Sequence, residues 1–202
     1  MYQPEVKLAF VKRYCNPASG WRFFVDIDPA EVGKAGGWPK TEKAWLRKKQ
    51  MQDRGQRAIE ALEKLGAKVG GSRAKWLSAL ADELGVSESP TIPGDRDIIA
   101  INPSLRRLLV AEVEGASTGQ PEQKIYKAVG QIVVAVGAVD PKAFDASFII
   151  AVHGEQLKNH LQKAKPLECI GVSAVCIEKD QSQDVLLFGS ALNQRRDGAQ
   201  IR

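Results

Sequence analysis

The chain has 202 residues, enough to bury one well-packed core, and its 44% hydrophobic and 26% charged residues are the balance of an ordinary globular domain. A formal net charge of +5 permits a polyanionic partner such as DNA but does not require one. The longest apolar runs fall short of the roughly 18 to 20 residues that cross a bilayer, and no signal peptide is evident, so we expect no membrane partner.

Cysteine and histidine usage disfavours two common kinds of site. The three cysteines, Cys15, Cys169 and Cys176, are odd in number and lack the paired spacing of zinc ligands, which favours a reducing, cytoplasmic setting. The two histidines, His153 and His160, lack the partners that a histidine metal site or a Ser-His-Asp triad would need. We expect both histidines to be surface residues.

The first part of the chain is predicted to be a strand and loop extension. Residues 21–27 are rich in aromatic and β-branched side chains, as strands are. The Gly and Pro residues at 33–39 indicate a loop after this strand.

Residues 41–66 are predicted to form a long helix, which Thr41 would cap and Gly66 would end. Cationic side chains are distributed around much of this helix. They either track phosphates or form an ordinary solvated face, which is the usual role of such a charge run. The residues concerned are Arg47, Lys48, Lys49, Arg54 and Arg57. A shorter amphipathic helix is expected over residues 72–85.

Two short apolar runs at 98–101 and 108–111, separated by a turn-initiating Asn-Pro pair, predict a β-hairpin. Asp97 heads the first strand, and Glu112 and Glu114 end the second. Side chains alternate along a strand, so Glu112 and Glu114 share one face. Two like charges so close together need a compensating cation, Lys or Arg.

The three acids have two interpretations. Oxygen ligands of this kind suit Mg²⁺, which takes one or two carboxylates and keeps several waters for substrate phosphates, so a phosphodiester is a candidate substrate. Alternatively, Glu112 and Glu114 mark the solvated face of an edge strand and pair with Arg106 or Arg107. The spacing alone favours neither interpretation.

Residues 121–136 are predicted to form a helix, because their apolar positions recur at steps of three and four. One flank carries Lys124, Lys127 and Gln131, and these polar groups would line a cleft beside the carboxylates. The alternative for the two lysines is a solvated helix face. Gln131 lies inside an otherwise apolar run, which favours a place in the site.

Strands and helices continue to alternate after this helix. A buried strand is expected at 146–152, a polar helix to about residue 164, and strands at 170–177 and 185–188. Such alternation predicts a three-layer α/β domain with a central mixed β-sheet flanked by helices.

The chain is expected to form one domain over residues 1–192. Its core would lie at about 41–190, with the N-terminal strand and loop extension at 1–40 and a polar tail at 193–202. No internal repeat or low-complexity segment indicates a second domain.

The order of these elements resembles the PD-(D/E)XK nuclease superfamily, which has the restriction-endonuclease-like fold. The resemblance covers roughly residues 50–152: a helix, a strand headed by Asp, a hairpin, a strand ending in Glu-x-Lys or a variant, and a helix. Asp97, which follows Pro93-Gly94-Asp95-Arg96, corresponds to the Asp of the motif, and Glu112 to the acidic residue of its second half. Glu114 stands where the family usually has Lys, as in the Glu-x-Glu variant of some restriction enzymes.

The resemblance implies a divalent-metal-dependent nuclease that hydrolyses DNA, in restriction, repair or the processing of mobile elements. Asp97, Glu112 and Glu114 would bind Mg²⁺ or Mn²⁺. Glu114 would alternatively orient or deprotonate the attacking water.

Residues on two helices would complete the site by the same resemblance. Lys124 or Lys127 would replace the missing strand lysine and stabilise developing charge, and Gln131 would position the water or a phosphate. Family members often carry a supporting acid on the first helix, for which Asp53 and Glu60 are the candidates here. Glu60 also suits a salt bridge with the lysine four residues later.

The acid at position 114 leaves a second function open, a catalytically inactive nuclease-fold module that binds nucleic acid or a protein partner. A third function, an enzyme acting on a small phosphorylated substrate, has no phosphate-binding loop to support it. A nuclease with a single site would need to pair as a homodimer to cut both DNA strands at once.

Overall fold

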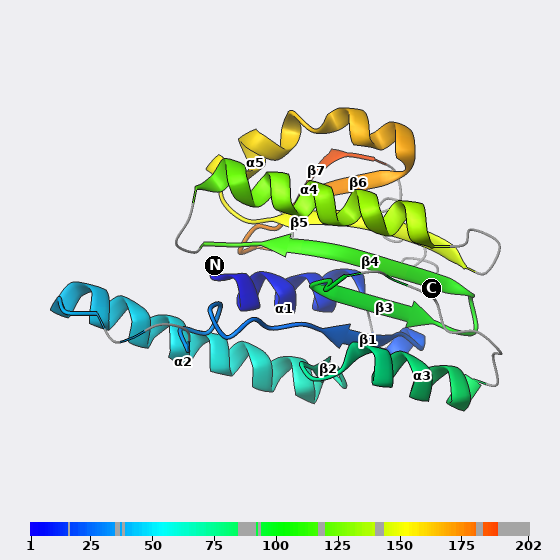
Figure 1. The fold of residues 1–202 in the computed structure, drawn as a ribbon, viewed down its shortest axis with the longest axis horizontal. Helices are drawn as coiled ribbons and strands as arrows, with labels where there is room; N and C mark the ends of the chain where they lie inside the picture. Colours follow the sequence, from blue (N-terminus) through cyan, green and yellow to red (C-terminus); the bar gives the residue numbers. More distant parts are fainter. Residues whose placement is uncertain are drawn as a thin grey trace.

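The structure, a computed structural model, shows one seven-stranded mixed β-sheet flanked by helices, so the expected three-layer α/β architecture is confirmed (Figure 1). The expected tail at 193–202 lies outside the described residues. Among the described helices, none is long and apolar enough to cross a membrane. The structure describes residues 1–15, 17–34, 37, 39–84, 92, 94–116, 120–139, 144–180 and 184–189.

The sheet has the strand order β2-β1-β3-β4-β5-β6-β7. The first four strands are β1 (Arg22–Val25), β2 (Lys68–Val69), β3 (Ile98–Asn102) and β4 (Arg107–Glu114), and the last three are β5 (Asp145–Val152), β6 (Val172–Cys176) and β7 (Val185–Phe188). The predicted hairpin is β3 and β4, which pair antiparallel, whereas β4 pairs parallel with β5. Because β4 lies in the middle of the sheet, the alternative of an exposed edge strand is wrong.

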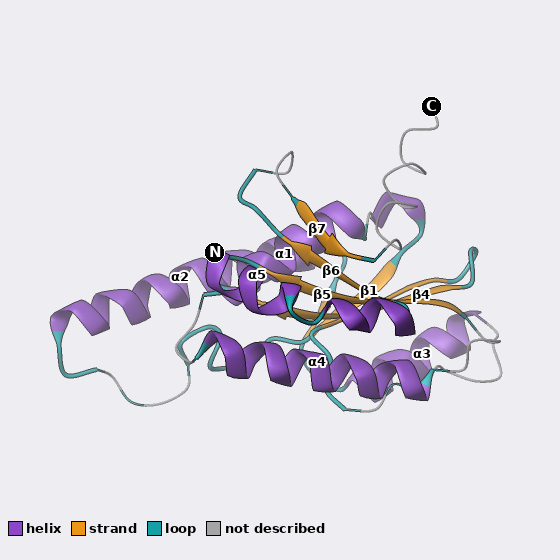
Figure 2. Ribbon diagram, turned by 90° about the horizontal axis from the view of Figure 1, so that it is seen from above, coloured by secondary structure: helices purple, strands orange, loops and turns teal. Residues whose placement is uncertain are grey.

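The helices lie on both faces of the sheet. They are α1 (Gln3–Tyr14), α2 (Glu42–Lys64), α3 (Arg73–Leu84), α4 (Pro121–Ala138) and α5 (Glu155–Gln162), with 3₁₀ turns η1 (Pro17–Ser19) and η2 (Lys165–Ile170). Helices α2, α3, α4 and α5 match the four predicted from the sequence. In Figure 2, α1 lies on one side of the strands and α3 and α4 on the other.

Alternation along β4 divides the apolar core in two. Leu109 and Val113 belong to the cluster beneath α1, whereas Val110 belongs to the cluster beneath α4. Because the alternation continues, Glu112 and Glu114 share the face that α4 covers. The prediction that these two acids are neighbours on one face is confirmed.

The N-terminal segment contains more than the predicted strand and loop. The strand is present as β1, but helix α1 precedes it and buries Val6, Phe10 and Val11 against the sheet. The same buried side of α1 carries Lys7, which is 0% exposed. A charge among the apolar positions interrupts the periodicity by which an amphipathic helix is recognised, and this explains why the sequence did not predict α1.

The start of the chain lies beside the end of β4. The Ala116 N–H donates to the carbonyl of Met1 at 2.9 Å, and the side-chain amide of Gln3 donates to the carbonyl of Val113 at 2.7 Å. A Cβ atom on Gly115 would lie 2.7 Å from the backbone nitrogen of Gln3. Only glycine fits this approach of two backbones.

Candidate functional site

The site forms where β4 extends past the start of β3. The register pairs Ile98 with Ala111, so Asp97 lies opposite Glu112 just beyond the last paired residues. Past this point the Val113 N–H donates to Oδ2 of Asp97 at 2.7 Å. The Asp97 carboxylate therefore takes the place of the missing strand partner, which fixes it against β4.

The other oxygen of Asp97 contacts a cation that the sequence analysis missed. Lys7 Nζ lies 2.7 Å from Asp97 Oδ1 and 2.8 Å from Glu31 Oε1, and it donates to the carbonyl of Asp26 at 2.6 Å. Burial lowers the pKa of Lys7, but the carboxylates of Asp97 and Glu31 outweigh burial and hold its pKa above the usual value. A lysine three residues before the buried Phe10 was the available sequence signal, because a charge on an apolar helix face needs a buried partner.

Glu112 is the acid with the least compensation. Its side chain is 4% exposed, and Oε1 has no hydrogen-bond partner among the described residues. Arg96 Nη1 lies 3.7 Å from Oε1, an ion-pair distance that is too long for a hydrogen bond. Burial, followed by the nearby Asp97, raises the pKa of Glu112 to about 9, against the opposing effect of Arg96. The carboxyl is therefore protonated at neutral pH unless another cation reaches it.

Glu114 has a cation of its own from α4. Lys124 Nζ lies 3.6 Å from Glu114 Oε2 and donates to the carbonyl of Gly115 at 2.9 Å. Burial raises the pKa of Glu114 to about 6, and Lys124 opposes this shift. Glu114 is thus largely ionised at neutral pH. Its amine partner, Lys124, is at the same time hydrogen-bonded to the carbonyl of Gly115.

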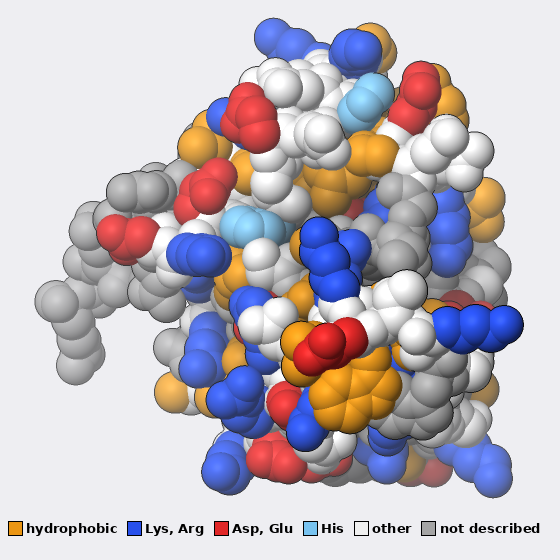
Figure 3. Space-filling model, turned by 90° about the vertical axis from the view of Figure 1, so that its left-hand side faces the viewer, with side chains coloured by type: hydrophobic (Ala, Val, Ile, Leu, Met, Phe, Trp, Pro, Cys, Tyr) orange, Lys and Arg blue, Asp and Glu red, His pale blue; other side chains and the backbone are white. Residues whose placement is uncertain are grey.

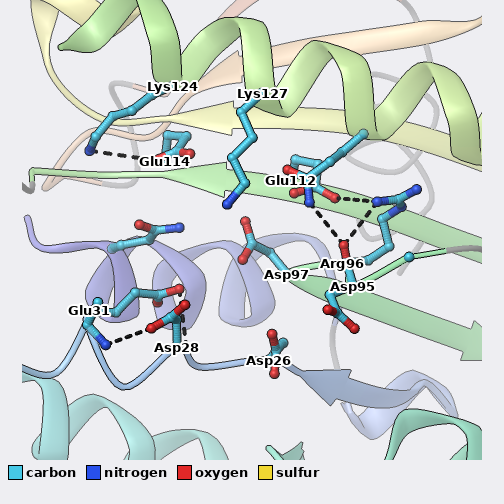
Figure 4. A pocket seen from close by; sticks show the side chains of 14 residues that line it. Asp26, Asp28, Glu31, Asp95, Arg96, Asp97, Glu112, Glu114, Lys124 and Lys127 are labelled. Atoms are coloured by element: carbon cyan, nitrogen blue, oxygen red, sulfur yellow. Dashed lines mark hydrogen bonds and ion pairs between the residues drawn. The ribbon is translucent and has the colours of Figure 1, made fainter. Parts of the chain in front are cut away.

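The two remaining predicted residues of α4 also reach the site. Lys127 points into the space bordered by Asp97 and Glu112, and it makes no hydrogen bond or ion pair with the residues that the structure describes (Figure 4). Gln131 donates its side-chain amide to the carbonyl of Asp95 at 3.1 Å. Gln131 therefore lines the cavity, as predicted, and holds the segment that leads into Asp97.

These side chains line a cavity of about 550 Å³. The carboxylates that line it outnumber the cations, so the cavity attracts positive charge unless some acids are protonated. The lining acids are Asp26, Asp28, Glu31, Asp95, Asp97, Glu112 and Glu114, and the lining cations are Arg96, Lys124 and Lys127. The sequence analysis had not predicted Glu31, whose pKa burial raises to about 7 against the effect of Lys7.

The two candidate supporting acids lie elsewhere. Asp53 and Glu60 are exposed on α2 and do not line the cavity. Glu60 accepts a hydrogen bond from Gln56 at 3.1 Å, and no ion pair joins it to Lys64 among the described residues. The register of α2 explains this placement, because the buried side of that helix consists of small and apolar residues such as Gly55.

The carboxyl oxygens at this site are the kind of ligand that a hard cation prefers, but their positions do not form a closed metal site. Within the described part of the chain, no three His, Cys, Asp or Glu side chains converge closely enough to hold a metal ion. Lys7 occupies one oxygen of Asp97, and Lys124 lies beside Glu114. However, the buried Oε1 of Glu112 lacks a hydrogen-bond partner there, and oxygen-only ligands suit Mg²⁺ or Mn²⁺.

No protein-family model and no curated protein matches the chain. The resemblance to the nuclease superfamily therefore rests on the motif residues and their arrangement, and it stays a prediction.

Proposed function

We propose that this chain is a divalent-metal-dependent nuclease that hydrolyses DNA phosphodiester bonds. The observation that carries the proposal is the position of Asp97 opposite Glu112, one residue beyond the paired part of β3 and β4, where a buried oxygen of Glu112 lacks a hydrogen-bond partner among the described residues. Two carboxyl groups that line a polar cavity are an arrangement that a hard cation and a phosphate would share.

In this proposal Asp97 and Glu112 hold Mg²⁺ or Mn²⁺, with Glu114 as a further ligand or as the base. When bound, the cation would polarise the scissile phosphate and lower the pKa of a water. Glu114 has a pKa of about 6, so at neutral pH it can accept a proton from the attacking water.

The contacts of the two lysines distinguish their proposed roles. Lys124 is held by Glu114 and the carbonyl of Gly115, so its role is to neutralise Glu114. Lys127 has no such contact with the described residues and points toward the acids (Figure 4). We therefore assign to Lys127 the stabilisation of charge that develops on the phosphate. Gln131 keeps Asp97 in place through its bond to Asp95.

The test is cleavage of supercoiled plasmid DNA with Mg²⁺ or Mn²⁺. We expect the wild type to nick or cut, and Asp97→Asn to lose the activity. The amide oxygen can accept from the Val113 N–H, but the amide nitrogen would then face Lys7 Nζ, so circular dichroism must verify that the variant remains folded. Glu63→Gln, a matched change at an exposed position of α2, should leave cleavage unchanged. Undiminished cutting by Asp97→Asn would overturn the site. Cutting both strands at once would require a homodimer, which sedimentation measures.

One observation favours the alternative of an inactive module that binds nucleic acid or a protein. Lys7 already neutralises Asp97 from within the fold, so the chain can keep its motif acid without a metal. Calorimetric titration with Mn²⁺ separates the two functions. A nuclease should bind Mn²⁺ and lose that binding in Asp97→Asn, whereas an inactive module need not bind it.

A further inference from the structure

Helix α2 extends beyond the sheet on the side where the candidate site lies. In Figure 1 the Glu42 end of α2 and the end of β4 point the same way. The helix has 23 residues, which span about 35 Å at about 1.5 Å per residue. Its buried residues are Gly55, Ala58 and Leu62, and none from Glu42 to Arg54 is buried. The first half therefore projects without a core beneath it, although packing normally supplies most of a helix's stability.

The cations of this projecting half differ in what they contact. Arg54 makes hydrogen bonds of 2.9 and 2.7 Å to the carboxylate of Glu5 on α1, and Lys48 donates to the carbonyl of Gly37 at 3.2 Å. Lys43 and Arg47 make no hydrogen bond or ion pair with the described residues. Some cations therefore attach α2 to the body of the protein, and others remain for a partner.

Two further cations of α2 also remain for a partner. Lys49 Nζ lies 5.2 Å from the ring centroid of Trp45, and among the described residues Arg57 donates only to the carbonyl of Asp53 in its own helix. We call Lys43, Arg47, Lys49 and Arg57 the α2 cationic face. Figure 3 views the molecule from the side toward which α2 projects, and Lys and Arg side chains are spread over much of that surface.

The charge of the chain is concentrated on this helix. From Glu42 to Arg57 there are six Lys or Arg residues and two acids, so the segment carries a formal charge of +4, compared with +5 for the whole chain. The cavity beside it carries an excess of acids. A polyanion that approaches an acidic cavity would be repelled unless a cationic surface nearby attracts it.

We propose that the α2 cationic face binds the phosphate backbone of duplex DNA and so holds the duplex beside the cavity. This inference rests on the proposed function, because it takes DNA as the substrate of the same site. Residues four apart on a helix stand about 6 Å apart along its axis, so Lys43 and Arg47 present successive charges along one line. Duplex DNA carries one charge per about 1.7 Å of its axis, which makes a cationic row a general backbone contact without base readout.

The test is the salt dependence of DNA binding by the double variant Lys43→Gln, Arg47→Gln. Fluorescence anisotropy with a short labelled duplex, in EDTA so that metal-dependent hydrolysis cannot occur, gives the affinity at each salt concentration. The matched control is Lys163→Gln, Lys165→Gln, which removes two exposed charges near the C-terminal end of α5, across the molecule from α2 (Figure 1). Circular dichroism verifies that each variant remains folded.

Each phosphate contact contributes about 0.9 to the slope of log affinity against log salt. We expect the α2 variant to lower the slope by about 1.8, so that between about 50 and 200 mM salt its affinity falls roughly 12-fold less than that of the wild type. The control should keep the wild-type slope. Equal slopes in the two variants, an unchanged slope in the α2 variant, or no DNA binding by the wild type would overturn the proposal.

Two further outcomes have a defined meaning. Self-association of the wild type that the α2 variant loses, with DNA binding unchanged, would assign this face to a second copy of the chain and overturn the proposal. Because the assay contains no divalent metal, its result is independent of cleavage. A duplex bound through α2 but not cut would overturn the nuclease assignment alone, whereas cutting with unchanged binding in the α2 variant would overturn the α2 assignment alone.

Discussion

Replacing Glu112 with Gln should make the protein more stable and inactive. The side chain is 4% exposed, and its pKa of about 9 lies well above the usual 4.5. The folded chain therefore keeps Glu112 protonated at neutral pH, whereas the unfolded chain ionises it. Because the pKa is raised in the folded state, the stabilisation is present below pH 4.5 and is lost as the pH rises toward 9. Glutamine keeps the shape of the carboxyl and never ionises.

The size of this effect follows from the titration window. Each pH unit above 4.5 costs the wild type about 1.4 kcal/mol relative to the variant, which gives up to about 3 kcal/mol at pH 7. For a chain of this length that difference corresponds to roughly 6 to 12 °C in Tm. Thermal melts of wild type and Glu112→Gln from pH 5 to 9 should diverge steadily, while Glu63→Gln, at an exposed position, should follow the wild type.

The same carboxyl should link metal binding to pH. Mg²⁺ or Mn²⁺ must displace the proton of Glu112, so the apparent affinity should rise about tenfold per pH unit up to about pH 9, and Glu112→Gln should lose the response. A variant that is no more stable than the wild type at pH 8, or a stability difference that does not change with pH, would show that Glu112 is ionised in the folded chain. Either result would refute the reasoning.

Four other substitutions test three separate parts of the structure. Lys7→Met should cost about 3 to 5 kcal/mol in urea unfolding, because it leaves Asp97 and Glu31, whose side chains are 15% and 10% exposed, without the buried cation that they share; a loss below about 1 kcal/mol would contradict the ion pairs of Lys7. Lys127→Gln should lower kcat about 10²- to 10³-fold at unchanged Tm, and an unchanged rate would remove Lys127 from the site. Gly115→Ala should lower stability by about 1 to 3 kcal/mol through a backbone clash, whereas Gly130→Ala on α4, where a Cβ meets no atom within 4 Å, should raise it by up to about 1 kcal/mol.

The part of the site that was predictable from the sequence is the part set by local rules. Asp97, Glu112 and Glu114 lie on one hairpin, and strand alternation with an Asn-Pro turn was sufficient to place them together. Lys124 and Lys127 follow on the next helix, whose apolar repeat fixes the side that covers β4. Each of these predictions used only a short stretch of sequence and the side-chain repeat of one strand or one helix.

The part that was missed depends on tertiary packing. Lys7, 90 residues before Asp97, contacts its carboxylate, and Glu31, 66 residues before it, contacts the same amine; no local period relates either residue to Asp97. Asp53 and Glu60 were proposed as supporting acids because α2 was taken as the first helix of the domain. The true first helix is α1, and its buried side carries a cation toward the motif acid instead of an acid.

The distribution of these cations bears on the acid at position 114, where the resemblance expects a lysine. Lys7 reaches Asp97 from α1 on one face of the sheet, and Lys124 reaches Glu114 from α4 on the other, so each of these acids has an amine at ion-pair distance. Glu112 has only a guanidinium at 3.7 Å, and its oxygen there accepts no hydrogen bond from the described residues. Glu112 is therefore the acid of this site that still lacks a compensating positive charge. A proton meets that need in the free protein, and a divalent cation would meet it in the proposed complex. Stability, metal affinity and cleavage should accordingly change together at this one carboxyl, since all three depend on which cation it accepts.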